Sequence, residues 1–298
     1  TDEIINTLKL PDNLTRFSAA KQALKKLKQA LREIKDGNSD IVNKTTIPTP
    51  IQLNGNSFEK KDTSVLTASI YLGAPSGLLQ ALINAGAEVN HKEPDWDNKS
   101  VLKLSLHRNN VRIWAAQLLL NHGANANDVK LQDLEGIINS TDIEDVAKAG
   151  LLDSLINNGF VVNPPNDSNE DTILHLYARI KSDKQLDFPF TIPRMRENLF
   201  AANVCDLTPW ETALRHSNVR TAAQFIAQMS TEEARNKEIT FVDEQNEKYT
   251  TTPLERALAW RDGKRSMHSS LRMNDVDWQT IEQVFLHIGV TAAELSTT

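Results

Sequence analysis

The chain has 298 residues, of which 40% are hydrophobic and 24% charged, and its formal net charge is −6. This mild acidity argues against nucleic acid as the main ligand, because phosphate binding requires a basic face. No apolar run approaches the roughly 20 residues of a membrane span, and the single cysteine, Cys205, leaves no partner for a disulfide within these residues, which fits the reducing cytoplasm.

Residues 1–60 do not repeat, and we expect a helical cap followed by a linker. Apolar residues three or four positions apart predict one helix with a narrow apolar seam. These are Phe17, Ala20, Leu24, Leu27, Leu31 and Ile34. Because its other sides are basic, we expect the helix to cover the end of the repeats that follow, with self-association or binding to an anionic membrane as alternatives. Residues 37–60, rich in Asn, Thr and Pro, are expected to be an exposed linker.

From residue 61 onward, two short motifs recur in phase. The first is a Ser or Thr followed by apolar residues, and its starts lie 36, 72 and 36 residues apart, so the unit near 136 has no recognisable opening. These starts are Ser64, Ser100, Thr172 and Thr208. The second motif comes one helix later and contains Gly86, Gly123 or Gly159. Two phased motifs with a period of about 20–50 residues predict one structural unit repeated in tandem.

Each unit is expected to form two helices. The Ser or Thr caps the first helix, and Thr208-Pro-Trp-Glu211 and Thr252-Pro-Leu-Glu255 add a capping box with Pro at the first helical position. Second helices are expected over 78–85, 111–122 and 151–158, and each ends at a glycine that adopts the left-handed conformation cheaply. The polar segment after each glycine is the loop that joins neighbouring units, and we call it a finger.

With these motifs the chain resembles the ankyrin repeat family, whose units begin Thr-Pro-Leu-His and end Gly-Ala-Asp-Val-Asn. The nearest matches are Thr172-Ile-Leu-His175 and Gly86-Ala-Glu-Val-Asn90, within a resemblance that covers roughly residues 60–290. The other units replace the family histidine by Thr67, Lys103, Glu211 and Glu255, and the period exceeds the family value of about 33 residues. The resemblance implies an all-α solenoid of about six helix-turn-helix repeats over residues 61–298, with units starting near 64, 100, 136, 172, 208 and 252.

Three segments interrupt the period. Pro189 and Pro193 break the second helix expected within 181–200, and a shortened helix is expected to restart near Pro193. The segments 231–250 and 263–275 lengthen the last two units, and a final helix is expected over 277–288, ending at Gly289. Such insertions either carry function or are tolerated, solvated spacers.

The sequence offers no recognisable catalytic, metal or cofactor site. Cys205 with His175 or His216 is a formal nucleophile–base combination, but no oxyanion loop or third orienting residue accompanies it. The seven histidines lack the spacing of zinc ligands, and no phosphate-binding glycine loop is present. We therefore expect no catalytic residue, no metal and no cofactor.

The predicted partner-binding residues lie seven and eight positions after each cap. The ankyrin resemblance implies that the inner helices end there and face a concave groove. The residues are Tyr71, His107, Arg108, Arg179, Arg215, His216 and Trp260. Arg and aromatic side chains dominate binding energy at interfaces, and several arginines along one groove favour an acidic or phosphorylated protein segment. The alternative is that some of them pair with finger carboxylates such as Asp95, Asp97 or Asp171.

One finger carries a further candidate, Trp96, which we expect at an exposed tip unless it folds back onto its neighbour. The function predicted from all of these residues is a non-catalytic, monomeric scaffold that binds a partner protein. Irregular repeats rich in Asn and Lys resemble those of intracellular bacterial effectors, which implies action in the cytosol of a host. The alternatives are an enzyme whose site lies in the irregular segments or in a further part of a longer chain, and a protein that self-associates through residues 17–34.

Overall fold

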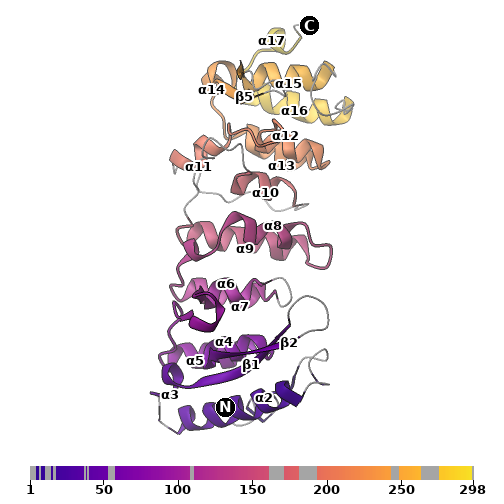
Figure 1. Ribbon diagram of the computed structural model, residues 1–298. Helices are drawn as coiled ribbons and strands as arrows, with labels where there is room; N and C mark the ends of the chain where they lie inside the picture. The colour runs from indigo at the N-terminus through magenta and orange to yellow at the C-terminus, as the bar shows by residue number, and fades with distance from the viewer. Residues whose placement is uncertain are drawn as a thin grey trace. The chain divides into compact units, whose positions relative to one another are not determined.

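The computed structural model of the chain describes residues 5–6, 8–10, 15, 18–36, 38, 40–52, 58–107, 111–160, 171–180, 193–242, 248–262 and 275–296. These residues are mostly helical, with three two-stranded antiparallel sheets, which agrees with the all-α class (Figure 1). The chain divides into two compact units. Unit 1 comprises Thr1–Ser140 and Ser154–Val161, and unit 2 comprises Thr141–Asp153 and Val162–Thr298.

Unit 1 begins with the amphipathic helix α2 (Ser18–Lys35), which buries its apolar seam within the chain. The buried residues are Ala20, Ala23, Leu27, Ala30 and Leu31. They lie on the side of α2 that packs against strand β1 (Thr46–Gln52) and helix α4 (Val65–Tyr71), so the helix covers the first repeated unit. Burial of this seam removes apolar surface from water, which favours folding.

The prediction of an exposed linker over 37–60 is wrong for the described residues of that segment. A short helix, α3 (Ile41–Lys44), leads into an antiparallel hairpin of β1 and β2 (Phe58–Ser64), with Thr46 opposite Ser64. Ile47 and Thr49 are buried, and the hydroxyls of Thr49 and Thr63 form a 2.8 Å hydrogen bond across the strands. The β-branched residues favour an extended chain here, and the prolines of β1 fit because an edge strand tolerates missing N–H donors.

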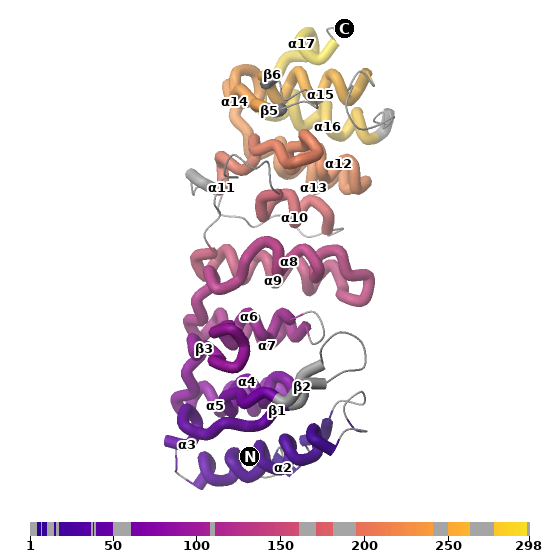
Figure 2. Tube along the Cα trace, in the orientation of Figure 1, coloured from indigo at the N-terminus to yellow at the C-terminus, as the bar shows by residue number. Residues whose placement is uncertain are grey.

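Two pairs of helices follow in unit 1, and corresponding helices pack on each other (Figures 1 and 2). In the first pair α4 is followed by α5 (Ser76–Asn84), and in the second α6 (Val101–Ser105) is followed by α7 (Ile113–Asn121). Helix α4 contacts α6, and α5 contacts α7. The finger between the pairs contains β3 (Lys92–Glu93), a turn of 3-10 helix η2 (Pro94–Trp96) and β4 (Lys99–Ser100). The predicted second helices over 78–85 and 111–122 are thus confirmed to within two residues.

The next unit was expected near Gly136 but begins earlier. A second 3-10 turn, η3 (Ala126–Asp128), precedes α8 (Leu131–Ile138), so Gly136 lies inside a helix. Lys130 occupies the N-cap position, and its backbone N–H donates to Asp133 Oδ2 at 2.9 Å. Because Lys130 is not a hydroxyl residue, the recurring Ser/Thr motif does not mark this start. Helix α9 (Asp145–Asn157) follows and begins before the predicted Leu151.

Within unit 1, asparagine side chains join successive repeats. Asn43 donates to the carbonyl of Gly86 at 2.8 Å and accepts from the amide of Glu88 at 3.0 Å. One repeat later, Asn90 donates to the carbonyl of Gly123 at 3.0 Å and accepts from the amide of Asn125 at 2.7 Å. Asn127 continues the series with the carbonyl of Gly159 at 3.2 Å. Each asparagine therefore satisfies the carbonyl at the end of a neighbouring helix, which lacks an intrahelical partner.

Unit 2 also contains paired helices, interrupted by the expected insertions. The helices are α10 (Ile173–Ala178), α11 (Pro193–Asn198), α12 (Pro209–Arg215), α13 (Val219–Ile226), α14 (Thr231–Asn236), α15 (Pro253–Asp262), α16 (Asp275–His287) and α17 (Ala292–Ser296). Helix α10 contacts α12, α12 contacts α13, and α13 contacts α16, while α11 begins at Pro193 as predicted. The insertion at 231–250 forms α14 and part of a hairpin of β5 (Ile239–Val242) and β6 (Lys248–Thr251).

The end of the last long helix agrees with the prediction. Gly289 follows α16 with φ of 98°, the left-handed conformation expected of a terminating glycine. The insertion expected over 263–275 lies almost entirely outside the described residues. No helix within the described ranges is both long enough and apolar enough to cross a membrane.

Candidate functional site

Three predicted partner-binding residues come together in unit 1. The ring centroid of Trp96 lies 5.8 Å from that of Tyr71 and 5.7 Å from that of His107, the latter in an edge-on arrangement. The Nζ atoms of Lys61 and Lys99 lie 5.4 and 6.0 Å from the Trp96 ring centre, within the range of cation–π attraction. We call Tyr71, Trp96 and His107 the aromatic cluster.

The aromatic cluster is mostly buried, so the expectation that Trp96 stands at an exposed tip is wrong. Trp96 is 4% exposed and Tyr71 is 5% exposed. The finger turns back because Asp97 and Asn98 adopt left-handed φ values of 54° and 56°, a conformation that these two residue types tolerate. Burial raises the pKa of the Tyr71 hydroxyl, which therefore stays neutral. The cluster fastens the finger onto the ends of α4 and α6.

A buried carboxylate that sequence reasoning missed supports the same finger. Glu93 is 1% exposed and accepts from Ser64 through its backbone N–H at 3.0 Å and its hydroxyl at 2.6 Å. From Lys130 onward the residue three positions after the cap supplies this acceptor, as Asp133 does for Lys130 and Glu211 for Thr208, each at 2.9 Å. Thr67 at that position in the first unit lacks a carboxylate, and this gap was the signal that an acceptor had to come from elsewhere.

In unit 2, Arg179 pairs with a finger carboxylate. Its guanidinium forms a hydrogen-bonded ion pair with Asp171, and the Asn203 side chain donates to the other oxygen of Asp171 at 2.7 Å. This is the arrangement that the alternative interpretation of the groove arginines described. The charge of Arg179 is compensated within the chain, which reduces its value for an acidic partner.

Trp260 is likewise engaged in the interior of unit 2. Its indole Nε1 donates to Glu211 Oε1 at 2.7 Å, and Trp260 is 4% exposed. The other carboxylate oxygen of Glu211 accepts from Arg256 Nε at 2.9 Å and from the Thr208 hydroxyl at 2.7 Å. Glu211 is fully buried, and Arg256 is 4% exposed. Sequence reasoning missed Arg256, although an arginine one turn before Trp260, on the same face of α15, suggested a buried charge partner.

His175 is a buried structural residue. Its Nδ1 accepts from the Thr172 amide at 3.0 Å, so its Nε2 carries the proton and donates to the Leu207 carbonyl at 2.7 Å. Burial is the main cause that lowers the pKa of His175 to about 4. Both ring nitrogens are occupied, which leaves none to activate Cys205. Among the described residues no group of His, Cys, Asp or Glu is arranged to hold a metal ion.

The remaining predicted residues differ in their surroundings. Arg215 and His216 are exposed at the end of α12. Arg215 makes no hydrogen bond or ion pair with any residue of the described ranges. Arg108 lies outside the described residues. The predicted set thus separates into the mostly buried cluster and Trp260, the paired Arg179, and the exposed end of α12.

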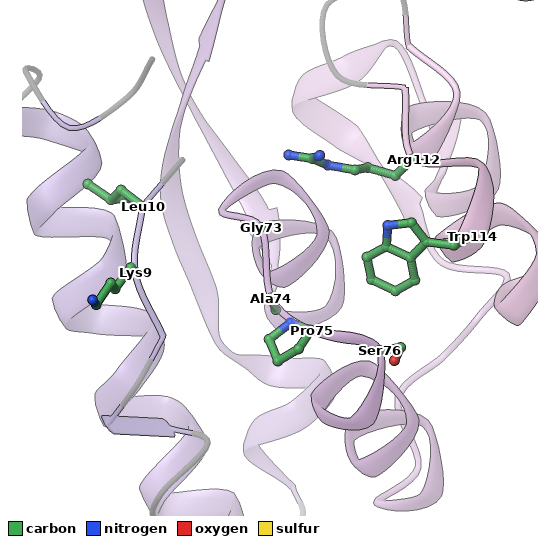
Figure 3. A pocket seen from close by; sticks show the side chains of 8 residues that line it. All are labelled: Lys9, Leu10, Gly73, Ala74, Pro75, Ser76, Arg112 and Trp114. Carbon is green, nitrogen blue, oxygen red and sulfur yellow. The ribbon is translucent and has the colours of Figure 1, made fainter. Parts of the chain in front are cut away.

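A surface pocket of about 540 Å³ lies in unit 1, close in sequence to the aromatic cluster (Figure 3). Its walls come from the N-terminal segment, from the turn between α4 and α5, and from the start of α7. The lining residues are Lys9, Leu10, Gly73, Ala74, Pro75, Ser76, Arg112 and Trp114. Sequence reasoning missed this pocket because it depends on three segments far apart along the chain.

Comparison with models of known protein families and with characterised proteins gives no match.

Proposed function

We propose that the chain is a non-catalytic, ankyrin-like scaffold that binds an acidic segment of a partner protein in the cytosol. The paired helices and the asparagine links between successive units of unit 1 support a repeat architecture. In such architectures each unit buries its apolar face on its neighbours, and the remaining surface serves partner binding. The resemblance to bacterial effectors extends the proposal to a partner in a host cell.

The observation that carries this proposal is the exposed, uncompensated guanidinium of Arg215. The other described arginine among the predicted positions, Arg179, is neutralised by Asp171. Arg215 instead ends α12 with its side chain exposed, next to the exposed His216. Arginine forms two parallel hydrogen bonds with a carboxylate or phosphate, so this helix end suits an acidic or phosphorylated segment.

The proposal is tested by affinity capture from eukaryotic cytosol with the full chain and two variants. Arg215→Glu reverses the charge at the proposed surface, and Arg220→Glu makes the same change at an exposed position on α13. We expect Arg215→Glu to lower recovery of specific partners about tenfold or more, while Arg220→Glu recovers them like the original protein. Both variants are required to keep the original melting temperature. Equal recovery by Arg215→Glu and the original protein would contradict the proposal.

A further inference from the structure

The pocket of unit 1 has the charge of an anion-binding site. Two of its eight lining residues, Lys9 and Arg112, are cationic, and none is acidic. Arg112 extends its guanidinium from the start of α7 across the space toward the α4–α5 turn, whereas Lys9 lies on the opposite side with its ammonium pointing away from Arg112, so Arg112 is the cation that faces the space (Figure 3). The Arg112 Nε is buried and has no hydrogen-bond partner among the described residues. Because Arg112 is only half-buried as a residue, the terminal amino groups of its guanidinium, rather than the enclosed Nε, are the donors available to a ligand oxygen.

The backbone at the pocket adds donors of the same polarity. Helix α5 begins at Ser76 and α7 begins at Ile113, each nine residues long. Their N-cap residues, Pro75 and Arg112, provide no side-chain acceptor for the first N–H groups. The N-terminal end of a helix carries partial positive charge, so two uncapped ends reinforce the attraction for an anion.

The wall between these helix ends is apolar and partly aromatic. Trp114 is 37% exposed, one of the few large apolar side chains of the described residues that reach solvent. Figure 3 shows its ring facing the pocket between Arg112 and Pro75. The exposed indole of Trp114 is a flat apolar surface, and it lies beside the charged N–H donors of the Arg112 guanidinium. Both residue types are frequent anchors at interfaces.

We propose that this pocket binds an acidic residue of a partner peptide and packs the adjacent apolar side chain of that peptide on Trp114. The carboxylate accepts from Arg112 and from the free N–H groups of α5 and α7. This assignment rests on the proposed scaffold function and adds a second contact point, in unit 1, to the Arg215 surface of unit 2. The volume of about 540 Å³ lies within the usual range of ligand sites.

A titration of the full chain tests the pocket without knowledge of the partner. The five tryptophans are replaced by 5-fluorotryptophan, and the ¹⁹F resonance of Trp114 is identified with Trp114→Phe. The probes are acetyl-Glu-Phe-amide and its uncharged match acetyl-Gln-Phe-amide. We expect the Trp114 resonance to shift saturably with the Glu peptide, with an affinity at least about tenfold above that of the Gln peptide. Equal shifts with both peptides, or none, would overturn the assignment.

Two further arms locate the charge and identify the ligand class. Arg112→Gln is expected to remove the preference for the Glu peptide, whereas Lys26→Gln, which removes an exposed cation of α2, keeps it. Sodium phosphate is titrated separately, and phosphate binding as tight as that of the Glu peptide would show a site for small anions and contradict a peptide site. Failure of these titrations removes the pocket alone, because the capture experiment tests the Arg215 surface independently.

Discussion

At the scale of single residues, one buried carboxylate of unit 2 joins two helices. Glu211 accepts from the backbone and hydroxyl of Thr208, from Arg256 and from Trp260. The two contacts from Thr208 cap α12, and the two from Arg256 and Trp260 come from α15 in the next repeat, so the side chain acts as a cap and as a cross-link. Glu255 has only the capping role, since it is exposed and accepts from the Thr252 amide at 2.8 Å.

We predict that Glu211→Gln destabilises the protein far more than Glu255→Gln. The first change leaves the buried Arg256 with Asp206, 3.6 Å away, as its remaining charged partner, and costs about 3 kcal/mol of unfolding free energy, the lower end of the cost of breaking a buried ion pair. The second weakens only a capping box and costs about 1 kcal/mol. Urea denaturation followed by circular dichroism measures both. Equal losses would show that the buried network contributes no more than the cap.

His175 gives the protein a specific sensitivity to acid. Its folded-state pKa of about 4 lies below the ordinary value of 6.5, so the unfolded chain binds a proton more readily. The contribution of neutral His175 is complete above pH 6.5 and is lost as the pH falls to about 4. The Arg196 side chain lowers the pKa of Glu233 to about 2. Ionised Glu233 therefore stabilises the folded state fully above about pH 4.5, and this stabilisation is lost as the pH falls toward 2.

We expect the free energy of unfolding to fall between pH 6.5 and 4 in the original protein and to fall less in His175→Gln. The amide is chosen because it can accept from Thr172 as Glu211 does from Thr208, but it does not titrate. Denaturant unfolding at pH 7, 5.5 and 4.5 provides the comparison. The same pH dependence in both proteins would exclude His175 as its source.

At the scale of elements, the ends of helices decide where the chain turns. Gly86, Gly123 and Gly159 follow α5, α7 and α9 with φ of 95°, 83° and 81°. Their carbonyls are the acceptors for the linking asparagines, so one residue both ends a helix and receives the link from the neighbouring unit.

A matched pair of glycine substitutions tests this role. Gly123→Ala is expected to destabilise unit 1 by about 1 kcal/mol, because an alanine in the left-handed region is strained although no atom lies within 4 Å of its added Cβ. Gly77→Ala, in the first turn of α5 with the same open surroundings, is expected to stabilise by about 0.5–1 kcal/mol. Melting temperatures that move in the same direction would contradict this account.

The elements show which parts of the fold are readable from sequence. Caps and terminating glycines are local signals, and they placed α4, α5, α7, α12 and the end of α16. The hairpin of β1 and β2 was missed because Pro48 and Pro50 resemble linker residues, whereas an edge strand accepts them. The burial of Trp96 depends on left-handed Asp97 and Asn98, which no local pattern announces. The pocket and the Glu93–Ser64 contact join distant segments, so only the folded chain brings them together.

At the scale of the whole molecule, the position of α2 bears on the number of copies that associate. Leu27 is fully buried, within the seam of α2 that packs on β1 and α4. A seam that packs inside one chain is not free to pair two chains, which favours the monomer expected from the sequence. The basic side chains of α2, including the exposed Lys26, remain at the surface.

We predict that Leu27→Glu lowers the unfolding free energy by about 3–5 kcal/mol, because it places a charge in an apolar contact. Lys26→Glu, at the adjacent exposed position, is expected to have little effect. Light scattering is expected to give the mass of one chain for the original protein. A dimer that dissociates on Leu27→Glu without a fall in melting temperature would show instead that the seam joins two molecules.

The asparagine links of unit 1 have a consequence for how the protein responds to force. Each link joins one repeat only to the next, so every junction carries the whole of a load applied along the row, and the weakest junction yields first. When a terminal junction yields, its repeat of about 36 residues unfolds into roughly 120 Å of extended chain. The other repeats keep their own links. We expect such a segment to lengthen stepwise under load.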